Sequence, residues 1–205
     1  MAAIEGFILA GGQSRRMGTD KSRLMINGQT FLERIAVELS AMSASVAVVG
    51  AGSAPVDLDA QNSKVGATRI RRVKDVYPTW GALGGVHAAL SACSSDWALV
   101  VACDFPFVTR NLFARLAELR HDFEAVAPIQ SDLVSQPLCS LYRVMPCLGR
   151  AEELIKSGER KPIALLQSVR TRWVPFTEIA DLEGASHFFD NINSPEDYDR
   201  ITERS

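Results

Sequence analysis

Residues 6–21 read GFILAGGQSRRMGTDK, and this stretch largely decides the expected fold. Residues 6–10 are a short apolar run of the kind that forms a buried β-strand. The run ends at Gly11 and Gly12, where the lack of side chains lets the backbone approach a ligand closely. Successive N–H groups of such a loop can face phosphate oxygens, so the stretch predicts a strand followed by an anion-binding loop.

Apolar runs and helical patterns alternate along the rest of the chain. Thr30 and Glu33 have the spacing of a capping box, and apolar residues recur on one helical face of the segment that follows. Residues 97–102 are uniformly apolar, which is typical of a central parallel strand buried on both faces. Further strands are expected at 45–49, 69–73, 125–129, 138–142 and 172–175, further helices at 83–93, 109–120, 145–157 and from 194 onward, and a loop with at most a short helix at 50–66.

This alternation predicts an α/β fold, with a mostly parallel sheet that is covered by helices on both faces. The chain has 205 residues, no internal repeat and no dividing linker, so one domain over residues 1–205 is expected. Open sheets of this kind bind ligands at the carboxyl ends of their strands. The loop after residue 10 and Asp104, which follows the apolar run at 97–102, should therefore share one rim.

Composition and charge argue against several classes of protein. The net charge is -2 with scattered basic residues, so no nucleic-acid partner is expected, and the densest basic cluster, at 69–74, is interpreted as a solvated strand face. No apolar stretch approaches the ~20 residues that span a bilayer, so a cytoplasmic protein without a membrane partner is expected. Isolated thiols and histidines are interpreted as structural or solvated rather than as metal ligands: Cys93, Cys103, Cys139, Cys147, His87, His121 and His187.

Positive side chains follow the two glycines of the first loop. Arg15, Arg16 and Lys21 add charge there, and a triphosphate suits backbone donors combined with long cations. The loop is neither a Walker A motif, G-x-x-x-x-G-K-[ST], nor the dinucleotide pattern G-x-G-x-x-G. By themselves these features leave a glycine turn with solvated arginines as an equal alternative.

Two carboxylates follow predicted strands. Asp104 has the position to hold Mg²⁺ through one oxygen, with a triphosphate and waters completing the octahedron, but capping of the next turn is the alternative. Asp75 lies three residues before Pro78, and the residues alone favour a turn closed by its carboxylate. The glycines at 81, 84 and 85 allow either close packing of a helix or close approach of a nucleoside.

The order and spacing of the whole loop, L-A-G-G-x-S-x-R-M-G-x-D-K, resemble a known pattern. It is similar to the nucleotidyltransferase loop of the nucleotide-diphospho-sugar transferase superfamily, and most of all to the molybdenum cofactor guanylyltransferase (MobA) family. Four later segments match that family in the same order, so the resemblance covers nearly the whole chain: Asp75 with residues 81–85 (GALGG), residues 101–106 (VACDFP), residues 136–138 (QPL) and residues 191–197 (NINSPED).

The resemblance implies roles for individual residues. Asp104 would be the magnesium ligand, while Arg16 and Lys21 would offset charge on the α-phosphate and on the leaving pyrophosphate; these three are the expected catalytic residues. Asp75 and Gly81 would contact the nucleoside. Lys21 and Asp104 also belong to the expected nucleotide-binding set. The set is completed by four residues whose backbone groups would hold the base and ribose: Leu9, Ala10, Gly11 and Gly12.

The resemblance also implies the base and the reaction. L-A-G-G is the form of guanine-using relatives, where cytosine-using ones have L-A-A-G, and backbone carbonyls are suited to the N–H donors of guanine. The expected reaction transfers GMP from GTP to the terminal phosphate of molybdopterin or its molybdenum form, on a three-layer α/β/α Rossmann-like nucleotidyltransferase fold. The expected partners are GTP, molybdopterin and proteins that deliver or receive the cofactor. The protein is expected to be a monomer.

Three features depart from the family pattern. Ala82 replaces the usual Pro, Gly50 stands where relatives often carry Asn, and the spacing from Asp75 to Gly81 is one residue shorter. Two other functions stay open. One is a cytidylyl- or sugar-1-phosphate nucleotidyltransferase on the same fold, and the other is a nucleotide-binding regulatory protein without turnover.

Overall fold

The computed structural model describes residues 3–10, 24–50, 64–65, 68–77, 79–190, 192 and 197–198. The strands of the main sheet are β1 (Ile4–Leu9), β4 (Val46–Val49), β5 (Lys64–Val65), β6 (Thr68–Val73), β7 (Trp97–Ala102), β8 (Ala125–Pro128), β9 (Cys139–Arg143) and β10 (Thr171–Val174). The α-helices are α1 (Phe31–Ser40), α2 (Gly81–Ala92), α3 (Arg110–Glu118), α4 (Val144–Lys156) and α5 (Pro162–Ser168).

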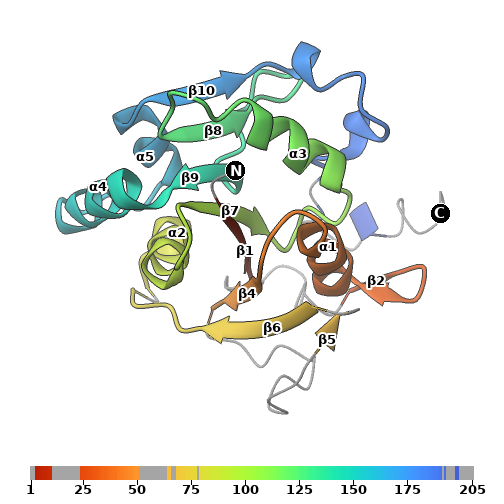
Figure 1. The fold of residues 1–205 in the computed structure, drawn as a ribbon, viewed down its shortest axis with the longest axis horizontal. Coiled ribbons are helices and arrows are strands. Elements are labelled where there is room, and N and C mark those ends of the chain that lie inside the picture. The colour runs from red at the N-terminus through yellow and green to blue at the C-terminus, as the bar shows by residue number, and fades with distance from the viewer. Residues whose placement is uncertain are drawn as a thin grey trace.

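Within this described part of the chain, eight strands form one sheet in the order β10-β8-β9-β7-β1-β4-β6-β5. Strand β9 runs antiparallel to both of its neighbours, and the edge strand β5 runs antiparallel to β6. The other neighbouring strands are parallel. Helices cover both faces, with α1 and α3 on one side and α2, α4 and α5 on the other (Figure 1). The expected three-layer α/β/α fold with a mostly parallel mixed sheet is confirmed.

The two outer layers are held by two separate apolar cores. Successive side chains of a strand point to opposite faces. Ile8 and Val101 therefore pack on the side of α1 and α3, while Phe7 and Val100 pack on the side of α2, α4 and α5. All six residues of β7 are buried, as the uniformly apolar run at 97–102 predicted.

The segment before α1 confirms one local prediction and adds a hairpin. The Thr30 hydroxyl accepts a hydrogen bond from the Glu33 N–H (3.2 Å), and the Glu33 carboxylate accepts one from the Thr30 N–H (2.8 Å), so the capping box is present. The short strands β2 (Met25–Ile26) and β3 (Gln29–Thr30) pair across Asn27 and Gly28. Both turn residues have positive φ, 50° and 78°, as a tight hairpin turn requires.

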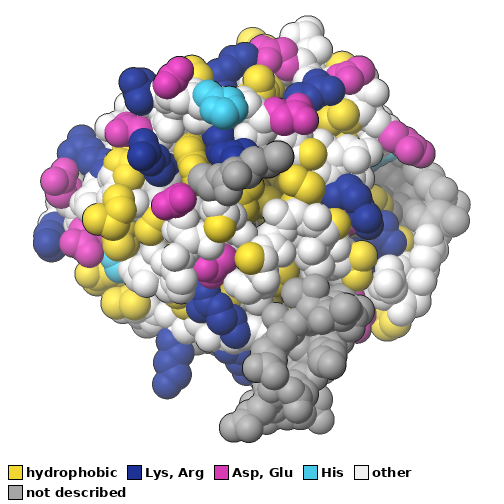
Figure 2. Space-filling view, in the orientation of Figure 1, with side chains coloured by type: hydrophobic (Ala, Val, Ile, Leu, Met, Phe, Trp, Pro, Cys, Tyr) yellow, Lys and Arg dark blue, Asp and Glu magenta, His cyan; other side chains and the backbone are white. Residues whose placement is uncertain are grey.

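One expectation about the following segments needs correction. A loop was expected throughout 50–66, but Lys64–Val65 forms β5; residues 51–63 lie outside the described part. The final helix was expected from 194, where only 197–198 are described, and these two residues are helical. Figure 2 shows basic side chains interspersed with acidic ones on the face it presents. No helix in the described residues has the length and hydropathy to cross a bilayer.

The basic cluster at 69–74 contains a structural arginine rather than only solvated ones. Glu5 of β1 is a buried acid, 6% exposed, and its Oε2 lies 2.9 Å from the Arg71 guanidinium. Its Oε1 accepts hydrogen bonds from the Ser94 N–H (3.0 Å) and the Ser95 hydroxyl (3.1 Å). Arg71 also donates to the Ala92 carbonyl (2.8 Å). This network ties β1, β6 and the end of α2 together.

We expect the Glu5→Gln variant to lose less stability on acidification than the natural protein. Burial raises the pKa of the Glu5 carboxyl, but hydrogen bonds from Arg71, Ser94 and Ser95 lower it by more, so the net shift is downward from 4.5. A lowered pKa contributes stability above the unfolded-state value and loses it as pH falls through the folded value. Urea unfolding from neutral pH to about pH 3 measures this. Equal pH dependence in the two proteins would contradict the assignment.

Candidate active site

Four parallel strands of the described sheet end at the same level. Leu9 at the end of β1 pairs with Ala102 of β7 and with Val49 of β4, and Val49 in turn pairs with Val73 of β6. The residues that directly follow these four ends therefore lie along one edge of the sheet. The register thus confirms that β1 and β7, which precede the first loop and Asp104 in the sequence, end at a common rim, while residues 11–23 of the loop lie outside the described residues.

Asp104 lies in a tight turn that follows β7. The Cys103 N–H donates to the Leu9 carbonyl (3.1 Å), and the Phe105 N–H donates to the Ala102 carbonyl (3.3 Å), so the turn is fixed to β1 and closed on itself. Atom Oδ1 of Asp104 is shielded from solvent. A carboxylate held in this way suits a hard divalent cation. Among the described residues no group of three or more His, Cys, Asp or Glu could hold a metal ion.

Asp75 follows β6 and closes a turn. Its Oδ1 accepts a hydrogen bond from the Tyr77 N–H (2.8 Å), which is the turn that the residues alone favoured. The Trp80 N–H then donates to the Tyr77 carbonyl (2.8 Å). These two bonds set the path of the chain from β6 into α2, and contact between Asp75 and a nucleoside stays a prediction.

The glycines at the start of α2 have different surroundings. A Cβ at Gly84 would lie 2.7 Å from the Tyr77 carbonyl oxygen, and one at Gly85 would lie 3.3 Å from a side chain of β1. Both of these glycines therefore serve packing. Gly81 instead has a φ of 63°, and a Cβ there would lie 3.9 Å from the Arg160 carbonyl oxygen. Of the three, Gly81 is the one with room for a ligand beside it.

Leu9 and Ala10 are the members of the predicted first loop that the structure describes. The Leu9 carbonyl accepts a bond from Cys103, and the Ala10 N–H donates to the Val49 carbonyl (2.9 Å). Since these backbone groups are engaged in the sheet, we expect the positions after Ala10 to make most of the contacts with a base. Those positions lie outside the described residues, as do the two predicted cations: Gly11, Gly12, Arg16 and Lys21.

The connection between α4 and α5 lies beside the start of α2, a proximity that the sequence did not predict. The Trp80 indole N–H donates to the Glu159 carbonyl (2.7 Å), and the Leu83 N–H donates to the Arg160 carbonyl (3.3 Å). The Arg160 guanidinium lies 5.0 Å from the centre of the Trp80 ring. Arg160 is exposed, so it adds positive charge to the Gly81 end of the rim.

The β8–β9 connection also belongs to this rim, because β8 and β7 run in the same direction on either side of β9. Gln136 is 8% exposed there, and its N–H donates to the Pro128 carbonyl (2.9 Å). Its carbonyl accepts bonds from the Cys139 N–H (3.0 Å) and the Ser140 hydroxyl (2.7 Å). These bonds fix the QPL segment at the edge of the sheet that carries Asp104.

Gly50 follows β4 on the same rim. Its φ is 137°, a conformation that L side chains rarely adopt, and its N–H donates to the Val73 carbonyl (3.3 Å). An asparagine at this position would be strained on this backbone. The departure from the family pattern therefore has a local cause.

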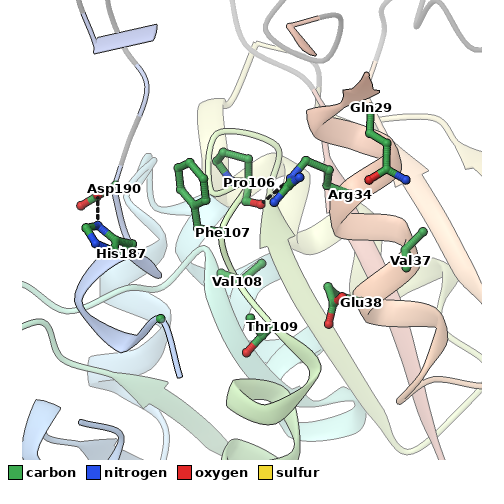
Figure 3. Close-up of a pocket in the computed structure, with 11 residues that line it drawn as sticks. Gln29, Arg34, Val37, Glu38, Pro106, Phe107, Val108, Thr109, His187 and Asp190 are labelled. Atoms are coloured by element: carbon green, nitrogen blue, oxygen red, sulfur yellow. Dashed lines mark hydrogen bonds and ion pairs between the residues drawn. The ribbon is translucent and has the colours of Figure 1, made fainter. Parts of the chain in front are cut away.

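A cavity of about 470 Å³ lies beside the segment that follows Asp104, between α1, the start of α3 and the C-terminal part of the chain (Figure 3). Its charges are largely balanced, since His187 contacts Asp190 at 2.8 Å and Glu38 pairs with Arg110 at 3.1 Å. Of the predicted site residues that the structure describes, none lines this cavity. A triphosphate needs an excess of positive charge, which this lining does not supply. The described lining consists of Gln29, Arg34, Val37, Glu38, Pro106, Phe107, Val108, Thr109, Gly184, His187 and Asp190.

The sequence matches the family described as MobA-like NTP transferase domain over residues 6–171. It is 30% identical over 197 residues to the probable molybdenum cofactor guanylyltransferase of Pelotomaculum thermopropionicum, covering 96% of this chain and 91% of that protein. It is 32% identical over 195 residues to the molybdenum cofactor guanylyltransferase of Vibrio atlanticus, covering 93% of this chain and 91% of that protein.

Solved structures share the fold. Molybdopterin-guanine dinucleotide biosynthesis protein A from Archaeoglobus fulgidus superposes with a TM-score of 0.77 at 24% identity, covering 98% of this chain and 97% of that one. The 2-C-methyl-D-erythritol 4-phosphate cytidylyltransferase of Thermus thermophilus superposes with a TM-score of 0.68 at 16% identity, covering 97% and 96%. The architecture is thus the nucleotidyltransferase fold. Because the family match runs from β1 through the rim residues into β10, the chain belongs to the MobA-like NTP transferase domain family.

Proposed function

We propose that this protein is a molybdenum cofactor guanylyltransferase, which transfers GMP from GTP to the terminal phosphate of molybdopterin or its molybdenum form. Relatives of that name, about 30% identical over more than nine tenths of the chain, support the proposal. The observation that supports it most is the strand register, in which Ala102, two residues before Asp104, pairs with Leu9 at the end of β1. We further propose that residues 1–205 act as a single-domain monomer in the cytoplasm.

The proposed reaction forms one bond and breaks one. An oxygen of the acceptor phosphate attacks the α-phosphorus of GTP, and the bond from that phosphorus to the bridging oxygen of the β-phosphate breaks, so pyrophosphate leaves. The acceptor phosphate is already ionised near neutral pH, so no general base is needed. Catalysis then consists of positioning and charge stabilisation.

Each predicted residue has a part in this proposal. Asp104 would hold Mg²⁺, which when bound supplies positive charge to the triphosphate oxygens. Arg16 and Lys21 would bind the α-phosphate and the leaving pyrophosphate. The nucleoside would lie between the L-A-G-G segment and the turn that carries Asp75 and Gly81.

The direct test supplies purified protein with Mg²⁺, a molybdopterin-bearing acceptor and each of GTP, CTP, ATP and UTP. Pyrophosphate release should be fastest with GTP, and mass spectrometry of the product should show the acceptor with one added GMP. A preference for CTP, or turnover with a sugar 1-phosphate in place of molybdopterin, would favour the other transferases on this fold. GTP binding without pyrophosphate release from any acceptor would favour a regulatory protein.

We expect the Gly12→Ala variant to use GTP less well and to improve CTP relative to GTP, without a full switch. Gly12 follows the part of the loop that the sheet already engages, and an added methyl group would narrow the gap at a base edge. A change of this size in a tight pocket is typically worth ~1–3 kcal/mol of discrimination. The measurement is kcat/KM for both nucleotides with the acceptor saturating.

Gly149→Ala is the matched control for this variant. Gly149 is an exposed residue of α4, and a Cβ there would meet no described atom within 4 Å, so nucleotide preference should be unchanged. If Gly12→Ala lowers kcat/KM equally for GTP and CTP, then Gly12 serves loop geometry and the base is read elsewhere.

A further inference from the structure

One face of α2 lies beneath the turn that enters it from β6. Gly84, His87 and Ser91 are spaced three and four positions apart, so they share this face. His87 is 4% exposed, although it belongs to a residue type that is usually found at least partly in solvent. The ring of Tyr77 packs on it in a T-shaped arrangement, with ring centres 5.0 Å apart and an interplanar angle of 72°.

Tyr77 is also fixed through its backbone. Its N–H is held by the Asp75 carboxylate and its carbonyl accepts the Trp80 N–H, both at 2.8 Å. That carbonyl comes so close to α2 that a Cβ at Gly84 would lie 2.7 Å from its oxygen. Tyr77 thus joins the residues beside Gly81 to the surface of α2.

The polar surroundings of His87 do not explain why a histidine stands there. Nδ1 lies 3.5 Å from the Ser91 hydroxyl, and Nε2 lies 3.7 Å from Oε1 of Glu152 on α4, which itself lies 4.0 Å from Lys156. Nε2 is buried and makes no hydrogen bond to the described residues. An aliphatic side chain would fill the same space without burying a ring nitrogen. What the imidazole provides is a flat partner for the Tyr77 ring.

We propose that His87 is a positioning residue for nucleotide binding. Through Tyr77 it holds Asp75 and Trp80 in the arrangement that leaves Gly81 open at the rim. The assignment of this turn to the nucleoside rests on the proposed function. Because Asp104 lies at the end of a different strand, loss of the His87 contact affects the binding of GTP more than the chemical step.

The test compares His87→Ala with His87→Phe, which keeps a flat ring against Tyr77 but has no nitrogen. We expect His87→Ala to raise KM for GTP roughly tenfold, with kcat and KM for the acceptor changed less than about threefold. His87→Phe should restore KM for GTP to within about threefold of the natural protein. His121→Ala, at an exposed histidine, is the matched control and should leave all three values unchanged.

Two results would overturn the inference. One is an unchanged KM for GTP in a folded His87→Ala variant. The other is an impairment of similar size in kcat, KM for GTP and KM for the acceptor that His87→Phe does not reverse, because this pattern indicates general destabilisation. If His87→Ala does not fold, Tyr77→Leu removes the same ring contact from the other side and should weaken GTP binding by a similar factor. Calorimetric titration of each protein with GTP and CTP, without acceptor, separates this inference from the proposed function. If the natural protein transfers no nucleotide but binds GTP, the affinities of the natural protein and of His87→Ala still test the role of His87. If the natural protein binds neither GTP nor CTP, both the role of His87 and the proposed function are refuted.

Discussion

Replacing Asp104 with asparagine should abolish turnover and leave the protein folded. The two side chains have nearly the same volume, and the turn that carries residue 104 is closed by backbone bonds from its neighbours Cys103 and Phe105. What the change removes is the negative charge that would hold Mg²⁺ against the triphosphate. Loss of metal-based charge stabilisation on the order of 4 kcal/mol corresponds to a rate reduction of about a thousandfold.

The measurement is pyrophosphate release over a range of Mg²⁺ concentrations, beside a thermal unfolding curve for each protein. Asp122→Asn is a suitable control, because Asp122 is exposed before the start of β8, at the opposite edge of the sheet, and its φ of 63° is one that asparagine tolerates. It should leave turnover and its dependence on Mg²⁺ unchanged. If Asp104→Asn keeps its rate at limiting Mg²⁺, the metal is held elsewhere and Asp104 serves only the turn.

Elements with strong local patterns could be predicted from the sequence. The uniformly apolar run of β7 and the capping box of α1 are local features, and both are confirmed. Strand direction is not local, because an apolar run does not specify its neighbour. The sequence therefore did not predict that β9 lies between β7 and β8 and runs antiparallel to both, which the strand pairing of the structure shows. Helix α5 was missed, since its seven residues bury only Leu165 and Leu166, too few for a periodic pattern.

The sequence of β1 contains an acidic residue that indicates a buried ion pair. Glu5 stands inside the apolar strand IEGFIL, and a charge in such a run needs a partner, because burial of an unpaired charge is costly. The partner is Arg71, within the cluster interpreted as solvated. Which basic residue it would be depends on the register of strands β1, β4 and β6, which residue spacing does not reveal.

The candidate site shows the same division between local and long-range information. The sequence did not show whether the glycines of α2 serve packing or contact with a ligand. The distances from a Cβ to its neighbours show that Gly84 serves packing and that Gly81 has room beside it. Arg160 was missed because its contact with Trp80 joins positions far apart in the sequence. The place of Asp104 at the rim could be predicted because a strand end followed by a carboxylate is a local pattern, while its role as a metal ligand stays a prediction.

Lys21 of the first loop is the other residue whose replacement should strongly lower the rate of transfer. We expect Lys21→Ala to lower kcat/KM for GTP by roughly 2–4 kcal/mol of transition-state stabilisation, the usual scale for removing one well-placed charge donor. Negative charge grows on the departing pyrophosphate as the bond to the α-phosphorus breaks. A lysine ammonium, a compact charge on a flexible stem, can follow that charge through the reaction.

A matched substitution separates this role from general loss of positive charge. Lys156→Ala removes an exposed lysine of α4, 74% exposed, and should leave kcat/KM within about twofold, because solvent and salt screen such a charge. Lys21→Arg keeps the charge but presents it as a planar fork, so partial recovery is expected. A loss below about tenfold in Lys21→Ala would reduce Lys21 to a solvated loop cation. The charge on the leaving pyrophosphate would then have to be met by Arg16, and Arg16→Ala should in that case show the larger loss.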